Sequence, residues 1–286
     1  MAPTVSTATA DETETSETRS SVLRTAVDLL RAQLWLVVPF FLVGVLGAAS
    51  SRARVDSPYP TAFSPFPQRG VISVQVPFVP PLEPAVEFSP ALLLGIRLES
   101  FLVLLGWQAV IAFMTAVVLA IALWTVSPET TGVVPPLPRI GWLFGYVFAV
   151  QSGSFALLFV SRSTVRPSIL AVMTFVIIVL AVAIALFLFP AFLVLGGLGP
   201  VDALLESVVH ASRPIRIAGF LLAIGTLGYV LTGVGQLPHW PTDGIVVGTI
   251  ASVTVAWTLY AAILAAAYLC WVDRRPGDPD EPARAG

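Results

Sequence analysis

Six long apolar runs constrain this chain more than any other feature of its sequence. A helix of about 20 residues spans the roughly 30 Å hydrocarbon core of a bilayer, and each run is close to or above that length. Of the 286 residues, 56% are hydrophobic and 11% are charged, which is more apolar surface than a soluble domain of this size can bury. The sequence therefore predicts an integral membrane protein. The runs are Gln33–Ser50, 89–126, Gly141–Val160, Pro167–Phe189, Ile215–Leu237 and Gly244–Val272.

Residues 21–33, "SVLRTAVDLLRAQ", have the pattern of an amphipathic helix just before the first run. Apolar residues recur at helical spacing on one face, and charged residues spaced for i,i+3 and i,i+4 pairs occupy the other. Such a segment is typical of a helix lying in the membrane interface. The apolar stripe is Leu23, Val27, Leu30 and Leu34, and the charged face is Arg24, Asp28 and Arg31.

A second segment, "GLGPVDALLESVVHASRP" at residues 197–214, has the same character. Pro200 suits the start of a helix, Asp202 sits favourably in its first turn, and Pro214 ends it. The apolar stripe is Val201, Leu204, Leu205 and Val208, and the polar face is Asp202, Glu206, His210 and Arg213. The expected fold class is an all-α integral membrane protein with six transmembrane helices and two interfacial amphipathic helices.

The sequence divides into a membrane domain with a polar tail at each end. Residues 1–20 and 273–286 have little to bury and are predicted to be disordered cytoplasmic tails. Residues 21–272 form the six-helix domain, and its Pro-rich stretch at 51–89 is predicted to be an external loop. The small residues that follow the first run leave open a second interpretation, a cleaved signal peptide.

The distribution of arginine predicts that both termini are cytoplasmic. Six spans put the two tails on one side together with the loops at 127–140 and 190–214. Nine arginines would then face the cytoplasm and six the exterior, which favours this orientation by a modest margin. The cytoplasmic set is Arg19, Arg24, Arg31, Arg139, Arg213, Arg216, Arg274, Arg275 and Arg284.

The stretch "PAFLVLGGLGPVDALLESVVHASRPIRIAGFLL" carries a family resemblance. An apolar run ending in proline is followed by a Gly-Pro turn, an amphipathic Ala-Leu-x-x-Ser helix and another span. This order resembles haloarchaeal six-span membrane proteins of uncharacterised function, which are similar to the membrane domain of some glycerophosphodiester phosphodiesterases. The specific pattern covers residues 190–225. The resemblance implies the six-span architecture and supplies no catalytic residues, and no phosphodiesterase domain is present in the sequence.

Four polar residues are predicted to lie inside the membrane: Gln108, Gln151, Ser152 and Ser154. Polar groups need partners there, and Gln108 in the second span is available to the three residues of the third. The favoured interpretation is hydrogen bonding between helices, at about 1 kcal/mol or less for each bond. The alternative is that these side chains line a path for a solute.

Small residues form two stripes that favour close helix packing. Gly141 and Gly145 begin the third span as a GxxxG pair, and the last span carries a longer stripe. Packing within the bundle is favoured over a homodimer contact for both. The longer stripe is Gly244, Gly248, Ser252 and Ala256.

Several classes of function are disfavoured by residues that the sequence lacks. Without lysine there is no phosphate-binding loop of the GxxxxGK[ST] type, and a net charge of −2 gives no basic surface for nucleic acid. Cys270 is the single cysteine, and the two histidines, His210 and His239, are predicted on opposite sides of the membrane. No metal, cofactor or enzyme activity is therefore predicted, and His210 is expected to face solvent or lipid headgroups.

The expected partners are the lipid bilayer and a membrane protein or a second copy of the chain. The leading hypothesis is a non-enzymatic scaffold, partner-binding or regulatory component of the cytoplasmic membrane. The alternative hypothesis is a permease-like subunit that moves a small or lipidic solute. No ionisable residue is predicted near the centre of any span, which argues against an ion-coupled transporter.

Overall fold

The computed structural model describes residues 22–57, 62–63, 79–84, 86–87, 97–126, 132, 134–163, 169–234 and 244–272. Within this part of the chain the regular structure is helical, apart from the short antiparallel pair β1 (Ala62–Phe63) and β2 (Val86–Glu87). The predicted tails and most of the Pro-rich loop lie outside the described residues. The predicted all-α class is confirmed.

Within the described residues, five helical stretches are long and apolar enough to cross a membrane, so the chain has the features of a multi-pass membrane protein. A sixth span was predicted where α5 (Leu137–Ser163) lies. That helix is 27 residues long, but it is not among the five, and the side chains of its second half lie outside those described. The five stretches lie within η1 (Leu34–Leu36) with α2 (Val37–Val55), α4 (Leu98–Val126), α6 (Ile169–Ala185) with α7 (Phe189–Val194), α9 (Pro214–Val234) and α10 (Gly244–Trp271).

Two helix boundaries differ from the predicted ones. The second run was expected to be helical from Ser89 and Pro90, which lie outside the described residues. The helix as described, α4, begins at Leu98, and the Arg97 carbonyl accepts a backbone hydrogen bond from Phe101. The fourth run was expected to be one helix, but α6 ends at Ala185 and α7 begins after a turn. Pro190 at the start of α7 has no N–H to donate to the preceding turn, which accounts for the break.

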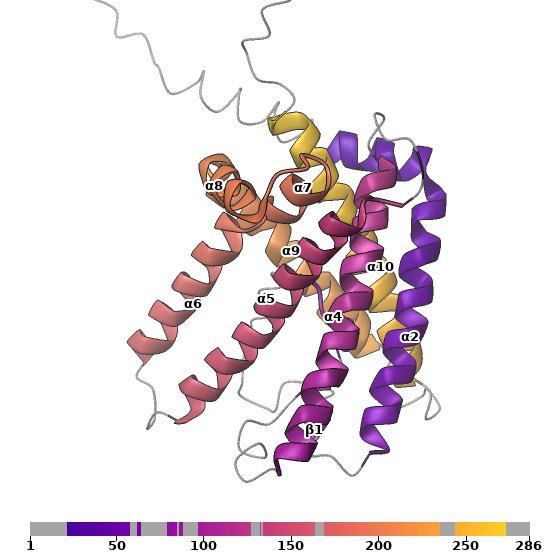
Figure 1. Cartoon of the computed structure of the whole chain (residues 1–286), viewed down its shortest axis with the longest axis vertical. Coiled ribbons are helices and arrows are strands. Elements are labelled where there is room, and N and C mark those ends of the chain that lie inside the picture. Colours follow the sequence, from indigo (N-terminus) through magenta and orange to yellow (C-terminus); the bar gives the residue numbers. More distant parts are fainter. Residues whose placement is uncertain are drawn as a thin grey trace, which may run out of the picture.

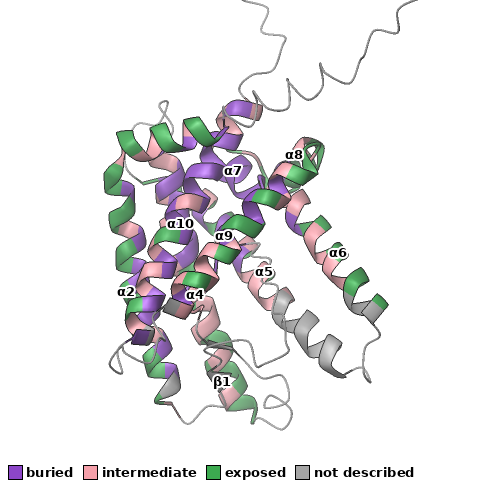
Figure 2. Cartoon of the chain, turned by 180° about the vertical axis from the view of Figure 1, so that it is seen from behind, coloured by how far each residue is buried: buried purple, intermediate pink, exposed green. Residues whose placement is uncertain are grey.

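Helix α10 forms the centre of the bundle. In its membrane-spanning stretch 72% of the residues are buried inside the protein, against 28–44% in the other four. All seven residues from Ala261 to Ala267 are buried. Figure 1 shows α2, α4 and α9 close to α10, and Figure 2 shows the buried residues gathered around it while α6 stands at the margin.

Helix α10 approaches its neighbours at positions where glycine leaves room. A Cβ atom on Gly44 of α2 would lie 3.1 Å from the carbonyl oxygen of Ile250 and 3.2 Å from Oγ1 of Thr254. On the other side, a Cβ atom on Gly228 of α9 would lie 3.4 Å from Oγ of Ser252. Small residues at such sites bring helix backbones into van der Waals contact, which is a main source of helix association in lipid.

The two predicted small-residue stripes have different environments. Ser252 donates a 2.8 Å hydrogen bond to the carbonyl oxygen of Gly228, and Ala256 would contact a Cβ there, so this part of the long stripe packs within the bundle. Gly244 and Gly248 are buried as well. The expectation of packing within the bundle was wrong for Gly141 and Gly145. Both are exposed, and a Cβ on either would meet no described atom within 4 Å.

The two predicted amphipathic segments are both helical. Residues 22–32 form a helix across one end of the bundle, at the end that also carries α7 and α8 (Pro200–His210) (Figure 1). The helix at 22–32 buries Val22 and Ala26, whereas Leu23 and Val27 of the predicted stripe are about two-fifths exposed. In α8 the buried residues are Ala203 and Ser207, and the apolar stripe is exposed. Its exposed members are Val201, Leu204, Leu205 and Val208.

We predict that Gly44→Leu destabilises the bundle by about 1–3 kcal/mol, because the larger side chain would push α2 away from the backbone of α10. Gly106→Leu is the matched control, since a Cβ on Gly106 of α4 meets nothing within 4 Å. Thermal unfolding of both purified variants in detergent measures the difference. Equal unfolding temperatures would show that the approach of α2 to α10 carries little of the stability.

Candidate functional site

The end of α2 carries polar side chains inside the protein. Ser51 donates a 2.8 Å hydrogen bond to the carbonyl oxygen of Gly47, and Ser57 donates one of 2.6 Å to that of Arg54. The Ser51 hydroxyl bonds back to the preceding turn of α2, and the Ser57 hydroxyl shares the Arg54 carbonyl with the Ser57 N–H. Arg52 and Arg54 lie in the last turn, where the helix dipole favours positive charge.

Residues 79–84 of the Pro-rich loop, which we call the strap, pack against this end of α2. Val79 and Leu82 are buried, with 8% and 3% of their surface exposed. The carbonyl oxygen of Leu82 lies against Gly47, at a position where a Cβ on that glycine could not fit. Glycine at 47 therefore lets the backbone of the strap reach the backbone of α2.

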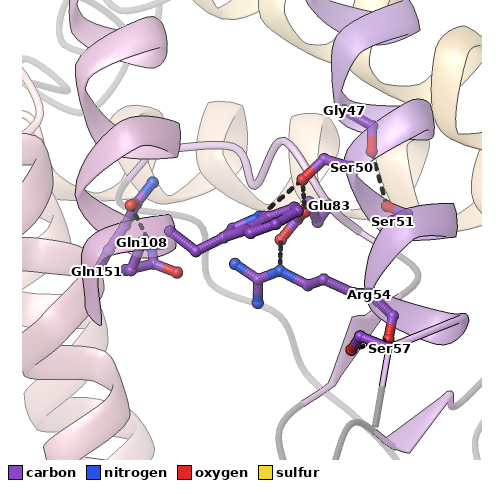
Figure 3. A network of polar contacts seen from close by, with 9 residues as sticks. Gly47, Ser50, Ser51, Arg54, Ser57, Glu83, Gln108 and Gln151 are labelled. Carbon is purple, nitrogen blue, oxygen red and sulfur yellow. Dashed lines mark hydrogen bonds and ion pairs between the residues drawn. The ribbon is translucent and has the colours of Figure 1, made fainter. Parts of the chain in front are cut away.

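A buried ion pair joins the strap to α2. Nε of Arg54 lies 3.2 Å from a carboxylate oxygen of Glu83, and the two side chains are only 3% and 9% exposed. Ser50 donates a hydrogen bond to the other carboxylate oxygen, and the indole N–H of Trp107 on α4 donates to the Ser50 hydroxyl at 2.9 Å. Figure 3 shows Glu83 between Ser50 and Arg54. The Arg54 guanidinium also lies 5.5 Å from the Trp107 ring centroid.

Burial raises the pKa of Glu83 above the ordinary glutamate value. The positive charge of Arg54 opposes this shift, as do the hydrogen bonds of the site, but the loss of water has the larger effect. The pair is thus costly to bury and strongly coupled. Removing either partner would leave the other charge in a poorly solvated place.

Gln108 and Gln151, two of the four predicted intramembrane polar residues, are joined across the α4–α5 interface. Nε2 of Gln108 donates a 2.5 Å hydrogen bond to Oε1 of Gln151. Ser152 is not joined to this pair, and its buried hydroxyl has no hydrogen-bond partner among the described residues. The side chain of Ser154 lies outside those described. The structure thus brings together two of the four residues, in the arrangement of a bond between helices.

His210 does not face solvent as expected. Only 15% of its side chain is exposed, and its Nδ1 lies 2.9 Å from the carbonyl oxygen of Glu206 and 3.5 Å from the Glu206 carboxylate. The ring packs on Phe192 of α7, with 5.4 Å between centroids. His239 lies outside the described residues, within which no group of three or more His, Cys, Asp or Glu side chains could hold a metal ion.

Arg139 has a structural environment that sequence analysis missed. Its Nη1 donates a 2.6 Å hydrogen bond to the carbonyl oxygen of Val194 at the end of α7, and its guanidinium lies 5.0 Å from the centroid of Trp124. Gly197, with φ of 63°, leaves space for the guanidinium. Arg139 therefore caps a helix C-terminus. Two features of the sequence could have indicated this contact: Arg139 is a single arginine at the start of the third predicted span, and Gly196 and Gly197 form a turn after the fourth.

Comparison of the chain with protein-family models, curated proteins and solved structures finds no match in any of the three. The arrangement of the described residues is therefore what bears on function.

We predict that Arg54→Leu destabilises the protein by about 3 kcal/mol, because it leaves the Glu83 carboxylate buried without its cation. The double variant Arg54→Leu, Glu83→Leu should recover most of that loss. Thermal unfolding of the wild type, both single variants and the double variant gives the coupling free energy. Additive effects in this cycle would mean that the two side chains act independently.

The raised pKa of Glu83 predicts a dependence of stability on pH. At pH values between the ordinary glutamate pKa of about 4.3 and the raised pKa, the Glu83 carboxyl is more often protonated in the folded protein than in the unfolded chain. The contribution of this group to stability is therefore largest below that window and falls as pH rises through it. Unfolding temperatures measured across the window should fall less steeply for Glu83→Gln than for the wild type. Identical slopes would contradict the prediction.

Proposed function

We propose that this chain is a six-span protein of the cytoplasmic membrane, with α5 as the sixth span and both termini in the cytoplasm. The length of α5 and its pairing with α4 through Gln108 and Gln151 support a membrane position for it. The excess of arginine on the side of the termini supports the orientation. The proposal extends to the relationship with haloarchaeal six-span proteins that residues 190–225 resemble.

The helix at 22–32 and α8 are proposed to lie in the cytoplasmic interface. Each packs against the bundle through small residues, Ala26 in one helix and Ala203 in the other, and exposes larger apolar side chains. Charged side chains occupy the remaining face of each, with Arg24 and Asp202 both exposed. A helix with one apolar face toward lipid and one charged face toward water is stable at this depth.

The proposed function is that of a non-enzymatic scaffold that binds a partner within the membrane. The observation that carries it is the environment of α6, which buries only Ala183 among its described side chains. Its apolar residues are 56–77% exposed at Leu170, Met173, Ile177 and Ile178. A helix with so little of its surface used inside its own chain has a long face open to a helix of another protein or of a second copy.

A permease-like subunit is the second candidate. It is supported by the buried hydroxyl of Ser152, which has no partner among the described residues, one position along α5 from Gln151. Against it stands the bond between Gln151 and Gln108, which satisfies two of the polar groups that would otherwise be available to a solute.

Photo-crosslinking in membranes tests the scaffold hypothesis. A photoreactive residue replacing Ile177 of α6 should yield a protein adduct whose mass identifies the partner, whereas one replacing the buried Ala266 of α10 should yield only crosslinks within the chain. Adducts with lipid alone at Ile177 would contradict the proposal.

Swelling of proteoliposomes in glycerol and in amino acids tests the permease. We expect the triple variant Gln108→Leu, Gln151→Leu, Ser152→Ala to lower the unfolding temperature and leave solute flux at the wild-type level. Loss of flux with unchanged folding and unchanged crosslinking at Ile177 would favour the permease instead.

A further inference from the structure

Among the described residues, the strap at residues 79–84 is held by apolar burial, by one backbone contact and by polar contacts of Glu83. Three apolar residues, Val79, Pro80 and Leu82, are buried, and one backbone oxygen rests on Gly47. The remaining contacts are polar and converge on Glu83. These three residues bury far less apolar surface than a transmembrane helix does. Removing one partner of a buried ion pair is strongly destabilising, so the polar contacts also help to keep the strap in place.

The polar contacts specify one position for the strap. Well-packed apolar residues would hold the strap against α2 about as strongly as a buried ion pair does. The ion pair differs in that it forms only when both charged groups are correctly placed. The Glu83 carboxylate lies between Arg54 and Ser50, and Trp107 binds Ser50 in turn. Trp107 of α4 thus bonds to the same α2 hydroxyl as Glu83, so the docked strap lies against the place where α2 and α4 meet.

Undocking would open this end of the α2–α4 interface. The strap covers α2 at Gly47 and places Glu83 against the side chains through which α2 and α4 meet. When the strap is released, the side chains of Glu83 and Arg54 both become hydrated. Their hydration offsets part of the lost attraction and so reduces the free-energy difference between the docked and the released strap. Gln108, the residue after Trp107, begins the polar contact between α4 and α5.

We propose that residues 79–84 are a releasable strap, latched by the Arg54–Glu83 pair, whose undocking opens the end of the α2–α4 interface to water. The strap is a conformational device that acts whether the chain serves as a scaffold or as a permease. Because Gly47 contacts the strap backbone and not the ion pair, the latch and the seat of the strap can be altered separately.

Cysteine labelling tests the strap. In a Cys270→Ala background, Leu82→Cys places a thiol under the strap, and Pro81→Cys places an exposed one beside it. A membrane-impermeant maleimide is applied to right-side-out and to inverted vesicles, so the result does not depend on orientation. We expect the thiol at 82 to react at least tenfold more slowly than the thiol at 81.

Release of the strap should remove that protection. Glu83→Ala, which breaks the latch, and Gly47→Ala, which disturbs the seat, should each speed labelling at 82 at least tenfold, and Gly106→Ala should leave it unchanged. A thiol at Ala266, buried in α10, should stay protected throughout, which separates release of the strap from unfolding of the bundle.

Two results would overturn the proposal. Continued protection at 82 in both folded variants, Glu83→Ala and Gly47→Ala, would mean that the strap is a permanent part of the core. Equal labelling of positions 81 and 82 without either substitution would mean that the strap does not dock. If Glu83→Ala does not fold, Gly47→Ala decides alone, because it keeps both charged side chains in the protein.

Discussion

Helix α10 packs closely on α2 and α9 at a glycine of each, and the other helices are arranged around those contacts. Lipid tails are as apolar as leucine, so helices in a bilayer gain little from hiding apolar side chains from one another. What remains is close packing, and Gly44 and Gly228 allow it on opposite sides of α10. The hydrogen bond from Ser252 to Gly228 is available only at this short range.

The helices themselves were predictable, because apolar length and helical spacing are local properties of the chain. The packing role of Ser252 and Ala256 was predictable for the same reason, since a stripe of small residues four apart lies on one helix face. Helix ends were less so. The Ser-Pro pair at 89–90 is typical of a helix start but lies outside the described residues, within which α4 begins at Leu98.

The candidate site was harder to predict, because its residues meet only through the fold. Ser50 and Glu83 are 33 residues apart, and Glu83 stands among prolines with no periodic pattern to assign it a face. The ring of His210 packs against Phe192, which belongs to another helix. Gly141 and Gly145 are a different case. A GxxxG pair indicates that another helix can approach closely, but it does not indicate whether that helix belongs to the same chain.

The distance along the chain between Arg54 and its partner has a consequence for biosynthesis. Synthesis runs from the N-terminus, so α2 and its terminal arginines leave the ribosome before the carboxylate of Glu83 exists, and Trp107 follows later still. During membrane insertion of α2, Arg54 therefore carries a positive charge, not yet neutralised by Glu83, that influences the orientation of the helix. In the finished protein the same charge is neutralised by Glu83, so the residue that influences insertion early becomes a fastening between segments once insertion is complete.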